Sequence, residues 1–400
     1  MKKTKTSVIY QVILFFVMIT MLFETQCLLG KPQENVVFAG NNDVISLPVK
    51  SYYLMDIYTE KMLVGSNENV RLEVASMVKL MTTLLTMEKI EKGEWSLNTM
   101  LLTSDYAASM EGSQAFLDAG SEYSVDELLK SIVVASANDS CVVIAENMSG
   151  SEQSFVDLMN TRAQELGMTN TLYANCTGLP APMQYSCAKD VAHILAEVYK
   201  HDIYHKYSTI WMDKIVHPSG RETELVNTNR LIRYYPGCDS GKTGFTDEAG
   251  YCLSASASKN GMRLVSVVIG AKSSAERFEH STALLNYGFN NYENRKLISN
   301  GSVVEGKYKI KGIKDEIEVR SDMDMYILTK RGDKNVDATI KIDFEVKKAK
   351  HIAEGEKVGT IYLIENGIVT KECNLVSAKE YKAYSYKDAI QDVFDSFRLY

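Results

Sequence analysis

Two side chains early in the chain have the types and the spacing needed for a nucleophilic reaction. Ser76 and Lys79 stand three residues apart in the sequence Ser-Met-Val-Lys. Residues at this spacing share one face of a helix, so the serine hydroxyl and the lysine amine are predicted to lie one turn apart. A serine is a weak nucleophile until a base removes its proton, and a lysine can be that base if burial and a second cation hold it neutral. The pair alone arises often by chance, and an ordinary helix start is the alternative.

Two further groups of polar residues follow along the chain. Ser136-Ala137-Asn138 stands between two helical segments, where a tight turn can present a hydroxyl and an amide. Lys242-Thr243-Gly244 precedes two apolar, strand-like segments, "AGYCLSASAS" and "MRLVSVVIGA". Its "GKT" also occurs in phosphate-binding loops, but Gly237 leaves three residues before Gly241 where that loop needs four. Because the spacing fails and a strand is predicted to follow, a nucleotide site is excluded.

The elements predicted around these groups combine helices with antiparallel strands. Helical periodicity runs from Ala75 to about Ile90. Ser124 with Glu127 forms a capping-box pattern before the segment that contains Ser136. Asn260-Gly261 between the two apolar segments is a hairpin signal. This order favours an α/β (α+β) catalytic domain over residues 45–292, with an antiparallel sheet flanked by helices, rather than a repeating βαβ fold.

The pattern changes near residue 300. Residues 300–378 alternate apolar and polar side chains with glycine turns, which predicts a small C-terminal all-β sandwich domain. Residues 384–400 return to helical spacing, with an aromatic and aliphatic face opposite an acidic one. We expect this amphipathic tail to lie at a membrane surface, and packing on the β domain is the alternative.

The N-terminal residues 1–30 predict a signal peptide. Lys2, Lys3 and Lys5 precede an apolar run from about Val8 to Phe23, which is typical of a secretory signal, with a permanent membrane helix as the alternative. We therefore expect an exported protein, at the outer face of the cytoplasmic membrane, in the cell wall or secreted. The net charge of -7 argues against nucleic-acid binding. No Cys-x-x-Cys or His-Glu-x-x-His pattern occurs, so no metal and no cofactor is expected.

The ordered set Ser-x-x-Lys, Ser-x-Asn and Lys-Thr-Gly resembles the signature of penicillin-binding proteins and serine β-lactamases. The blocks "EVASMVKLMT", "SANDS", "NCTGLP" and "GKTGFTDEAGYCLSASASKNGMRL" further resemble the low-molecular-mass penicillin-binding proteins, the serine-type D-alanyl-D-alanine carboxypeptidases of peptidase family S11. The resemblance covers roughly residues 45–290 and implies a β-lactamase/transpeptidase-like catalytic domain. Where many members have Ser-Gly-Asn, this chain has Ser136-Ala137-Asn138.

The resemblance implies a role for each motif residue. Ser76 would attack the penultimate D-alanine carbonyl of the peptidoglycan pentapeptide stem and form the acyl-enzyme, with Lys79 as general base. Ser136 would pass a proton to the leaving D-alanine, and the backbone N–H groups of Ser76 and Phe245 would form the oxyanion hole. Water would hydrolyse the ester, and β-lactam antibiotics would be covalent inhibitors. The residues expected to bind substrate are Asn138, Lys242, Thr243, Gly244 and Phe245.

Other functions stay open on the residues alone. A class A serine β-lactamase needs a glutamate, in a Glu-x-x-Leu-Asn motif, to activate the deacylating water, and the nearest segment, from Glu222 to Asn227, is out of register. A transpeptidase would use the same residues but pass the acyl group to an amine. A non-catalytic cell-wall-binding protein would have no need of the intact reactive set.

Overall fold

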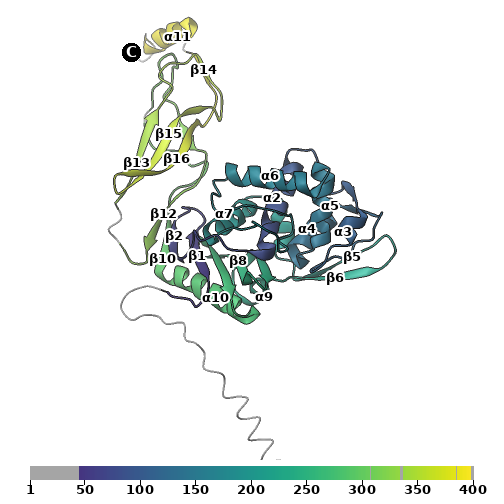
Figure 1. Cartoon of the computed structure of the whole chain (residues 1–400). Coiled ribbons are helices and arrows are strands. Elements are labelled where there is room, and N and C mark those ends of the chain that lie inside the picture. The colour runs from purple at the N-terminus through teal and green to yellow at the C-terminus, as the bar shows by residue number, and fades with distance from the viewer. Residues whose placement is uncertain (1–44, 307, 334–336, 384, 398–400) are drawn as a thin grey trace, which may run out of the picture. The chain divides into compact units, whose positions relative to one another are not determined.

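The computed structural model describes residues 45–306, 308–333, 337–383 and 385–397, and Figure 1 shows their course. The predicted signal peptide, residues 1–30, lies outside the described residues. Two compact units divide the chain, residues 1–47 and 48–400. All the helices and strands below belong to the second unit.

A five-stranded antiparallel sheet organises the first part of this unit. Its order is β2-β1-β9-β8-β7, which brings strands from both ends of this part together. The predicted Asn260-Gly261 hairpin joins β8 to β9, and both turn residues have positive φ, 52° and 77°. The strand bounds are β1 (Ser51–Asp56), β2 (Met62–Ser66), β7 (Cys238–Thr246), β8 (Gly250–Lys259) and β9 (Met262–Ala271).

Helices cover both faces of this sheet, as the sequence predicted (Figure 1). On one face α10 (Ser274–Asn291) lies against β8 and β9, where a Cβ on Gly288 would stand 2.4 Å from the Leu264 side chain. On the other face Val265 and Val267 belong to the main apolar core. Neighbouring side chains of a strand point to opposite faces, so burial of both sets explains why β9 is apolar along almost its whole length.

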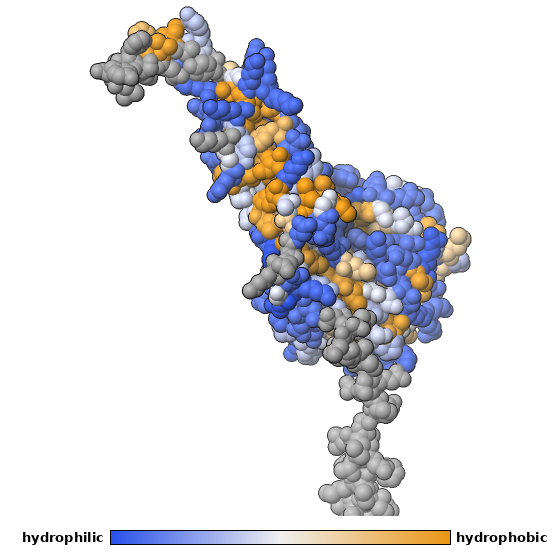
Figure 2. Space-filling model, turned by 90° about the vertical axis from the view of Figure 1, so that its left-hand side faces the viewer, coloured by the Kyte–Doolittle hydropathy of each residue, from blue (hydrophilic) through white to orange (hydrophobic). Residues whose placement is uncertain are grey.

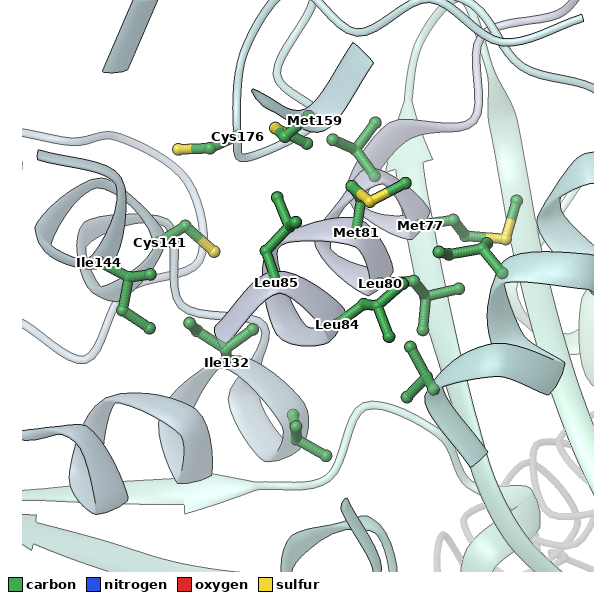
Figure 3. Packing of buried hydrophobic residues seen from close by; sticks show 14 of the residues in the cluster. Met77, Leu80, Met81, Leu84, Leu85, Ile132, Cys141, Ile144, Met159 and Cys176 are labelled. Atoms are coloured by element: carbon green, nitrogen blue, oxygen red, sulfur yellow. The ribbon is translucent and has the colours of Figure 1, made fainter. Parts of the chain in front are cut away.

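The main core forms around α2 (Lys79–Glu91), which Figure 3 shows between its neighbours. Leu85 of α2 lies beside Ile132 and Cys141, which come from two other helices. The helices of this part are α2, α3 (Asp105–Ala108), α4 (Val125–Ala135), α5 (Asn138–Ser149), α6 (Glu152–Glu165), α7 (Ala188–Tyr199), α8 (Asp202–Ser208) and α9 (Leu231–Tyr234). Two short pairs complete it, β3 (Met100–Leu102) with β4 (Glu122–Ser124) and β5 (Met212–Val216) with β6 (Glu222–Val226).

The first predicted helix differs from expectation at its start. Residues Ala75–Val78 form a 3₁₀ helix, η1, and the α-helix begins only at Lys79. Side chains three residues apart eclipse one another in a 3₁₀ helix, so the expected alignment of Ser76 with Lys79 survives. The predicted capping box is confirmed, because the Ser124 hydroxyl and the Glu127 carboxylate each bind the other residue's backbone N–H at the start of α4.

The remaining part is β-rich, with a second apolar core of its own. A four-stranded sheet has the order β11-β16-β15-β13, and β10 pairs with β12 and β14 with β17. The bounds are β10 (Tyr292–Ile298), β11 (Val319–Ser321), β12 (Met325–Lys330), β13 (Ala338–Phe344), β14 (His351–Ile352), β15 (Lys357–Glu365), β16 (Ile368–Ser377) and β17 (Tyr381–Lys382). The predicted all-β character of this part is confirmed.

The last element is the amphipathic helix α11 (Tyr386–Phe397). Four of its large side chains are exposed: Tyr386, Ile390, Val393 and Phe394. Figure 2 shows apolar atoms of this helix in orange at the end of the chain. Among the described helices, none has the length and hydrophobicity to cross a bilayer.

Candidate active site

The Ser76 hydroxyl and the Lys79 amine lie within hydrogen-bond reach, with Oγ and Nζ 2.8 Å apart. Ser76 is partly exposed, whereas Lys79 is fully buried at the first turn of α2. Lys79 Nζ also donates to the backbone carbonyl of Thr177. The first pair predicted from spacing is therefore assembled, with the nucleophile facing outward and the base enclosed.

The surroundings of Lys79 favour its neutral form. Burial is the largest influence and lowers the pKa of Lys79 to about 8, because a buried ammonium loses its hydration. The carboxylate of Asp139 acts the other way, raising this pKa. An ordinary lysine holds its proton until about pH 10.4, so Lys79 is far closer to serving as a base near neutral pH.

The second and third motifs meet beside this pair. Ser136 ends α4 in the left-handed region, at φ 65° and ψ 33°, and its Oγ lies 2.7 Å from Lys242 Nζ on β7. Both side chains are buried. Burial lowers the pKa of Lys242 well below its ordinary value, and the neighbouring cations Lys79 and Arg277 lower this pKa further. Two polar motifs more than 100 residues apart thus share one hydrogen bond.

Within the part of the chain that the structure describes, the side-chain amide of Asn138 forms a hydrogen bond through its nitrogen but not through its oxygen. Its Nδ2 donates to the Glu111 carbonyl, and its backbone N–H donates to the Ser113 carbonyl at 2.7 Å. Its Oδ1 is buried and finds no hydrogen-bond partner among the described residues. A buried acceptor without a partner is costly, so this oxygen is available to a ligand N–H.

The remaining predicted substrate residues lie on β7, the last strand in the order of the sheet. Thr243 Oγ1 donates to Thr228 Oγ1 at 2.8 Å. A Cβ on Gly244 would stand 2.7 Å from the Val74 carbonyl and 3.1 Å from Ser76 N, so the glycine lets β7 approach the nucleophile segment. The Phe245 ring is 48% exposed and packs against Tyr251, with ring centroids 4.3 Å apart.

Three features of the site carried no assignment at the sequence level. Arg277 of α10 donates to the Gly244 carbonyl at 3.1 Å and lies near Lys242. Gly178, with φ of +82°, passes so close to the nucleophile segment that a Cβ would stand 2.1 Å from the Ala75 carbonyl. Asp139 is buried and binds the loop that Asn138 also contacts. Gly178 lies in the "NCTGLP" block and Asp139 in the "SANDS" block, so both were part of the resemblance but carried no role, whereas Arg277 lies outside the quoted blocks.

Comparison with known families follows the two parts of the fold. Residues 39–273, more than half of the chain, match the family model described as D-alanyl-D-alanine carboxypeptidase, peptidase family S11. The chain belongs to this family. Residues 292–383 of this S11 family member match a second model, described as penicillin-binding protein 5, C-terminal domain. The family predicted from the motifs is confirmed.

Named relatives of this S11 family member extend over most of its length. It is 42% identical to the D-alanyl-D-alanine carboxypeptidase DacF of Bacillus subtilis over 332 residues, 83% of this chain and 85% of the relative. DacC of Escherichia coli is 33% identical over 80% of this chain and 81% of its own. The crystal structure of penicillin binding protein 5 from Haemophilus influenzae superposes with a TM-score of 0.69 at 28% identity, covering 84% of this chain and 98% of that one. The predicted fold class is confirmed.

Proposed function

We propose that the protein is a serine-type D-Ala-D-Ala carboxypeptidase that removes the terminal D-alanine from the peptidoglycan pentapeptide through an acyl-enzyme on Ser76. The observation that carries this is the buried Lys79 amine, 2.8 Å from the Ser76 hydroxyl. A reactive serine next to a base with a lowered pKa is the arrangement that nucleophilic catalysis requires.

Acylation begins when Lys79 takes the Ser76 hydroxyl proton. Ser76 Oγ then bonds to the carbonyl carbon of the penultimate D-alanine, and the carbonyl oxygen becomes an oxyanion. When the C–N bond breaks, the leaving amine needs a proton, which Ser136 donates. Ser136 can recover a proton from Lys242, which lies 2.7 Å away. The products are free D-alanine and the Ser76 ester. Water then hydrolyses the ester, Lys79 returns its proton to the departing Ser76 oxygen, and the proton that water gives up replaces the one lost by Lys242.

The edge strand β7 gives the oxyanion hole a geometric basis. N–H groups along an antiparallel strand alternate between its two sides. The Gly241 N–H points away from the sheet to Tyr204 Oη, at 3.3 Å, so the Phe245 N–H four residues later points to the same side. Gly244 stands against Ser76 N. We therefore expect the N–H groups of Phe245 and Ser76 to converge, and loss of one such donor would cost about 3–4 kcal/mol in the transition state.

Substrate recognition would use the groups that surround this hole. Asn138 Oδ1 would accept the N–H of the peptide, and Lys242 with Thr243 would bind its terminal carboxylate. Because burial and two neighbouring cations lower the pKa of Lys242, its positive charge needs a counter-ion. The substrate carboxylate would raise this pKa again, so binding of the anion and protonation of Lys242 support each other.

A β-lactamase is the second candidate, and the fate of the ester separates the two. The segment that most nearly fits the required glutamate motif lies on the exposed hairpin of β5 and β6. There Glu222 pairs with Lys214 at 2.7 Å, and both side chains are about half exposed. This surface pair does not favour rapid hydrolysis of a β-lactam ester, so β-lactams are proposed as covalent inhibitors.

We further propose the division of the chain and its location. Residues 1–30 would be the signal peptide, 45–292 the catalytic domain, 300–378 the β-sandwich domain and 384–400 the tail. The export signal in the sequence supports action on the cell wall outside the cytoplasm, and the exposed apolar side chains of α11 support attachment to the membrane surface.

The function is tested with fluorescent penicillin and a diacetyl-Lys-D-Ala-D-Ala peptide. Wild type is expected to form a covalent adduct and release D-alanine, and Ser76→Ala is expected to abolish both. Ser109→Ala is the matched control, because this exposed serine hydrogen bonds to the Tyr106 carbonyl on the short helix α3. Absence of an adduct or of D-alanine release in wild type would sink the proposal. Rapid turnover of penicillin would establish the β-lactamase instead.

A further inference from the structure

The carboxylate of Asp139 binds a loop far from it in sequence. Its Oδ1 accepts the Ala115 N–H at 3.0 Å, and its Oδ2 accepts the Leu117 N–H at 3.1 Å. Oδ1 also accepts the N–H of Ser140, at 2.8 Å, in the first turn of α5. Asp139 is 1% exposed, and no lysine or arginine among the described residues forms a salt bridge with it. Backbone N–H groups therefore satisfy this buried carboxylate.

The same loop, residues 111–117, also binds the neighbouring Asn138. The carbonyls of Glu111 and Ser113 accept from Asn138 Nδ2 and from its backbone N–H. Every second residue of the loop, at positions 111, 113, 115 and 117, is thus bound to Asn138 or to Asp139. The alternate hydrogen bonds hold the loop alongside residues 138 and 139.

We propose that Asp139 is a positioning residue for acylation, whose carboxylate fastens residues 111–117 to the Ser136-x-Asn138 segment and so fixes the direction of the Asn138 amide. The inference rests on the proposed function. The loop occupies Asn138 Nδ2, so Oδ1 is the end left for the substrate. If the loop moved away, the amide could rotate and present a donor where the substrate N–H needs an acceptor.

A purely structural reading assigns Asp139 to the start of α5, where a carboxylate stabilises the first turn. That reading accounts for the contact with Ser140 within the helix. It does not account for the two N–H groups 22 and 24 residues away, which belong to the loop that holds Asn138. The two readings differ in what a substitution does to catalysis in a protein that still folds.

The surroundings of Lys79 supply a second measurable effect. The groups that face its amine are the Ser76 hydroxyl, the Thr177 carbonyl, the thiols of Cys141 and Cys176, Asp139 and Lys242. Burial raises the pKa of Cys141 to about 12 and that of Cys176 well above its usual range, so both thiols are neutral near pH 7. Asp139 is then the one anion of this set. Its removal would lower the pKa of Lys79 further.

The experiment compares the acylation rate constant for fluorescent penicillin, from pH 6 to 10, in wild type, Asp139→Asn and Asp139→Glu. Asp139→Asn places an NH₂ group against one loop N–H and should slow acylation about 10- to 100-fold. It should also move the rising limb of the pH profile to lower pH. Asp139→Glu keeps the charge but displaces the carboxylate. Its acylation should therefore be slow, while the rising limb of its pH profile stays at the wild-type position. In both variants the release of D-alanine from the diacetyl-Lys-D-Ala-D-Ala peptide should fall in parallel with acylation.

Asp118→Asn is the matched control. Asp118 adjoins the same loop and loses the same charge, but its carboxylate binds Arg221 and Ser219, at 2.7 and 2.8 Å. The acylation rate of Asp118→Asn should differ from wild type by less than about 5-fold, because the ion pair of Asp118 with Arg221 is partly exposed.

Each outcome decides the inference. If Asp139→Asn acylates at the wild-type rate with an unchanged pH profile, the inference is wrong although the function stands. If wild type forms no adduct, the proposed function fails and the inference fails with it. If neither Asp139 variant folds, as judged by circular dichroism and thermal unfolding, Asp139 serves stability and the positioning role is wrong.

Discussion

Two buried lysines, Lys79 and Lys242, make the chemistry of the site depend on pH. Each would be charged at neutral pH in water, and burial lowers the pKa of both. Each lysine forms a hydrogen bond with one serine of the site, Lys79 with Ser76 and Lys242 with Ser136. The sequence predicted that burial and a second cation would keep Lys79 neutral. In the structure burial is the largest influence on the pKa of Lys79 and lowers it, and Asp139 opposes it.

The pH profile of acylation should rise with pH. Only neutral Lys79 can take the Ser76 proton, so the rate should increase as the pH passes the pKa of about 8. Well below this pKa, each pH unit should change the rate about 10-fold. Because Lys242 is close enough to influence the titration, the apparent midpoint belongs to the pair. The measurement is the rate constant for fluorescent penicillin from pH 6 to 10.

Lys79→Arg is the control for this profile, because it keeps a cation that does not lose its proton in proteins. The variant should acylate at least about 100-fold more slowly, the usual contribution of a general base. An active Lys79→Arg protein, or a wild-type rate that does not rise between pH 6 and 8, would contradict the role of Lys79 as base.

At the scale of elements, close backbone contacts hold the nucleophile in place. The segment η1 (Ala75–Val78) stands between the loop with Gly178 and the strand β7 with Gly244. A side chain on either glycine would collide with the backbone of residues 74–76. Ala75 itself has a φ of 48°, a conformation that such surroundings must enforce. The position of Ser76 therefore depends on backbone from two distant parts of the chain.

Gly178→Ala should impair acylation far more than a similar change elsewhere. The new Cβ would stand 2.1 Å from the Ala75 carbonyl and 2.9 Å from Ser76 N, so the nucleophile segment must shift. A displacement of this kind can reduce the rate about 100-fold. The matched control is Gly93→Ala, whose φ of +74° is similar but whose Cβ would meet no heavy atom of the described residues within 4 Å.

Gly93→Ala should cost stability only, about 1–2 kcal/mol for a left-handed residue. Rates of penicillin acylation and urea unfolding curves distinguish the two effects. Equal acylation rates for Gly178→Ala and Gly93→Ala would show that the contact with residues 75 and 76 does not position the nucleophile.

At the scale of the whole molecule, the catalytic part is followed by a β-rich part and a short amphipathic helix. The β-rich part has its own apolar core and matches a C-terminal domain known from penicillin-binding protein 5. Helix α11 is 12 residues long, and its described apolar side chains are exposed. A helix of this kind can lie on a membrane with its apolar face among the lipid headgroups.

Deletion of the residues after about 384 should release the protein from membranes without loss of activity. The reason is that the apolar face of α11 is the proposed contact with lipid, whereas the reactive residues lie between 76 and 245. The measurement is penicillin-binding activity in membrane and soluble fractions of cells that express the full chain or the shortened one. Ile390→Asp with Phe394→Asp is a milder test of the same face. Retention of either variant on membranes would argue against the anchor.

Local sequence features determined the reactive set, the capping box, the hairpin and the change to a β-rich part. Each depends on residues close together along the chain: Ser76 with Lys79 on one helical face, Ser124 with Glu127, and Asn260-Gly261 with positive φ. The family resemblance added the order of the motifs and hence the expected chemistry. Even the 3₁₀ start of the first helix left the pair aligned, because spacing of three residues serves both helix types.

Tertiary structure alone decided the contacts between distant segments. The hydrogen bond from Lys242 to Ser136 spans 106 residues, and the Asp139 carboxylate reaches a loop more than 20 residues away. The lowered pKa of Lys79 and the tight approach of Gly178 likewise depend on what surrounds them. Burial and backbone approach arise from the packing of the sheet against its helices, which no local pattern records. The sequence therefore determined which groups react, and the packed fold decided how they are held and charged.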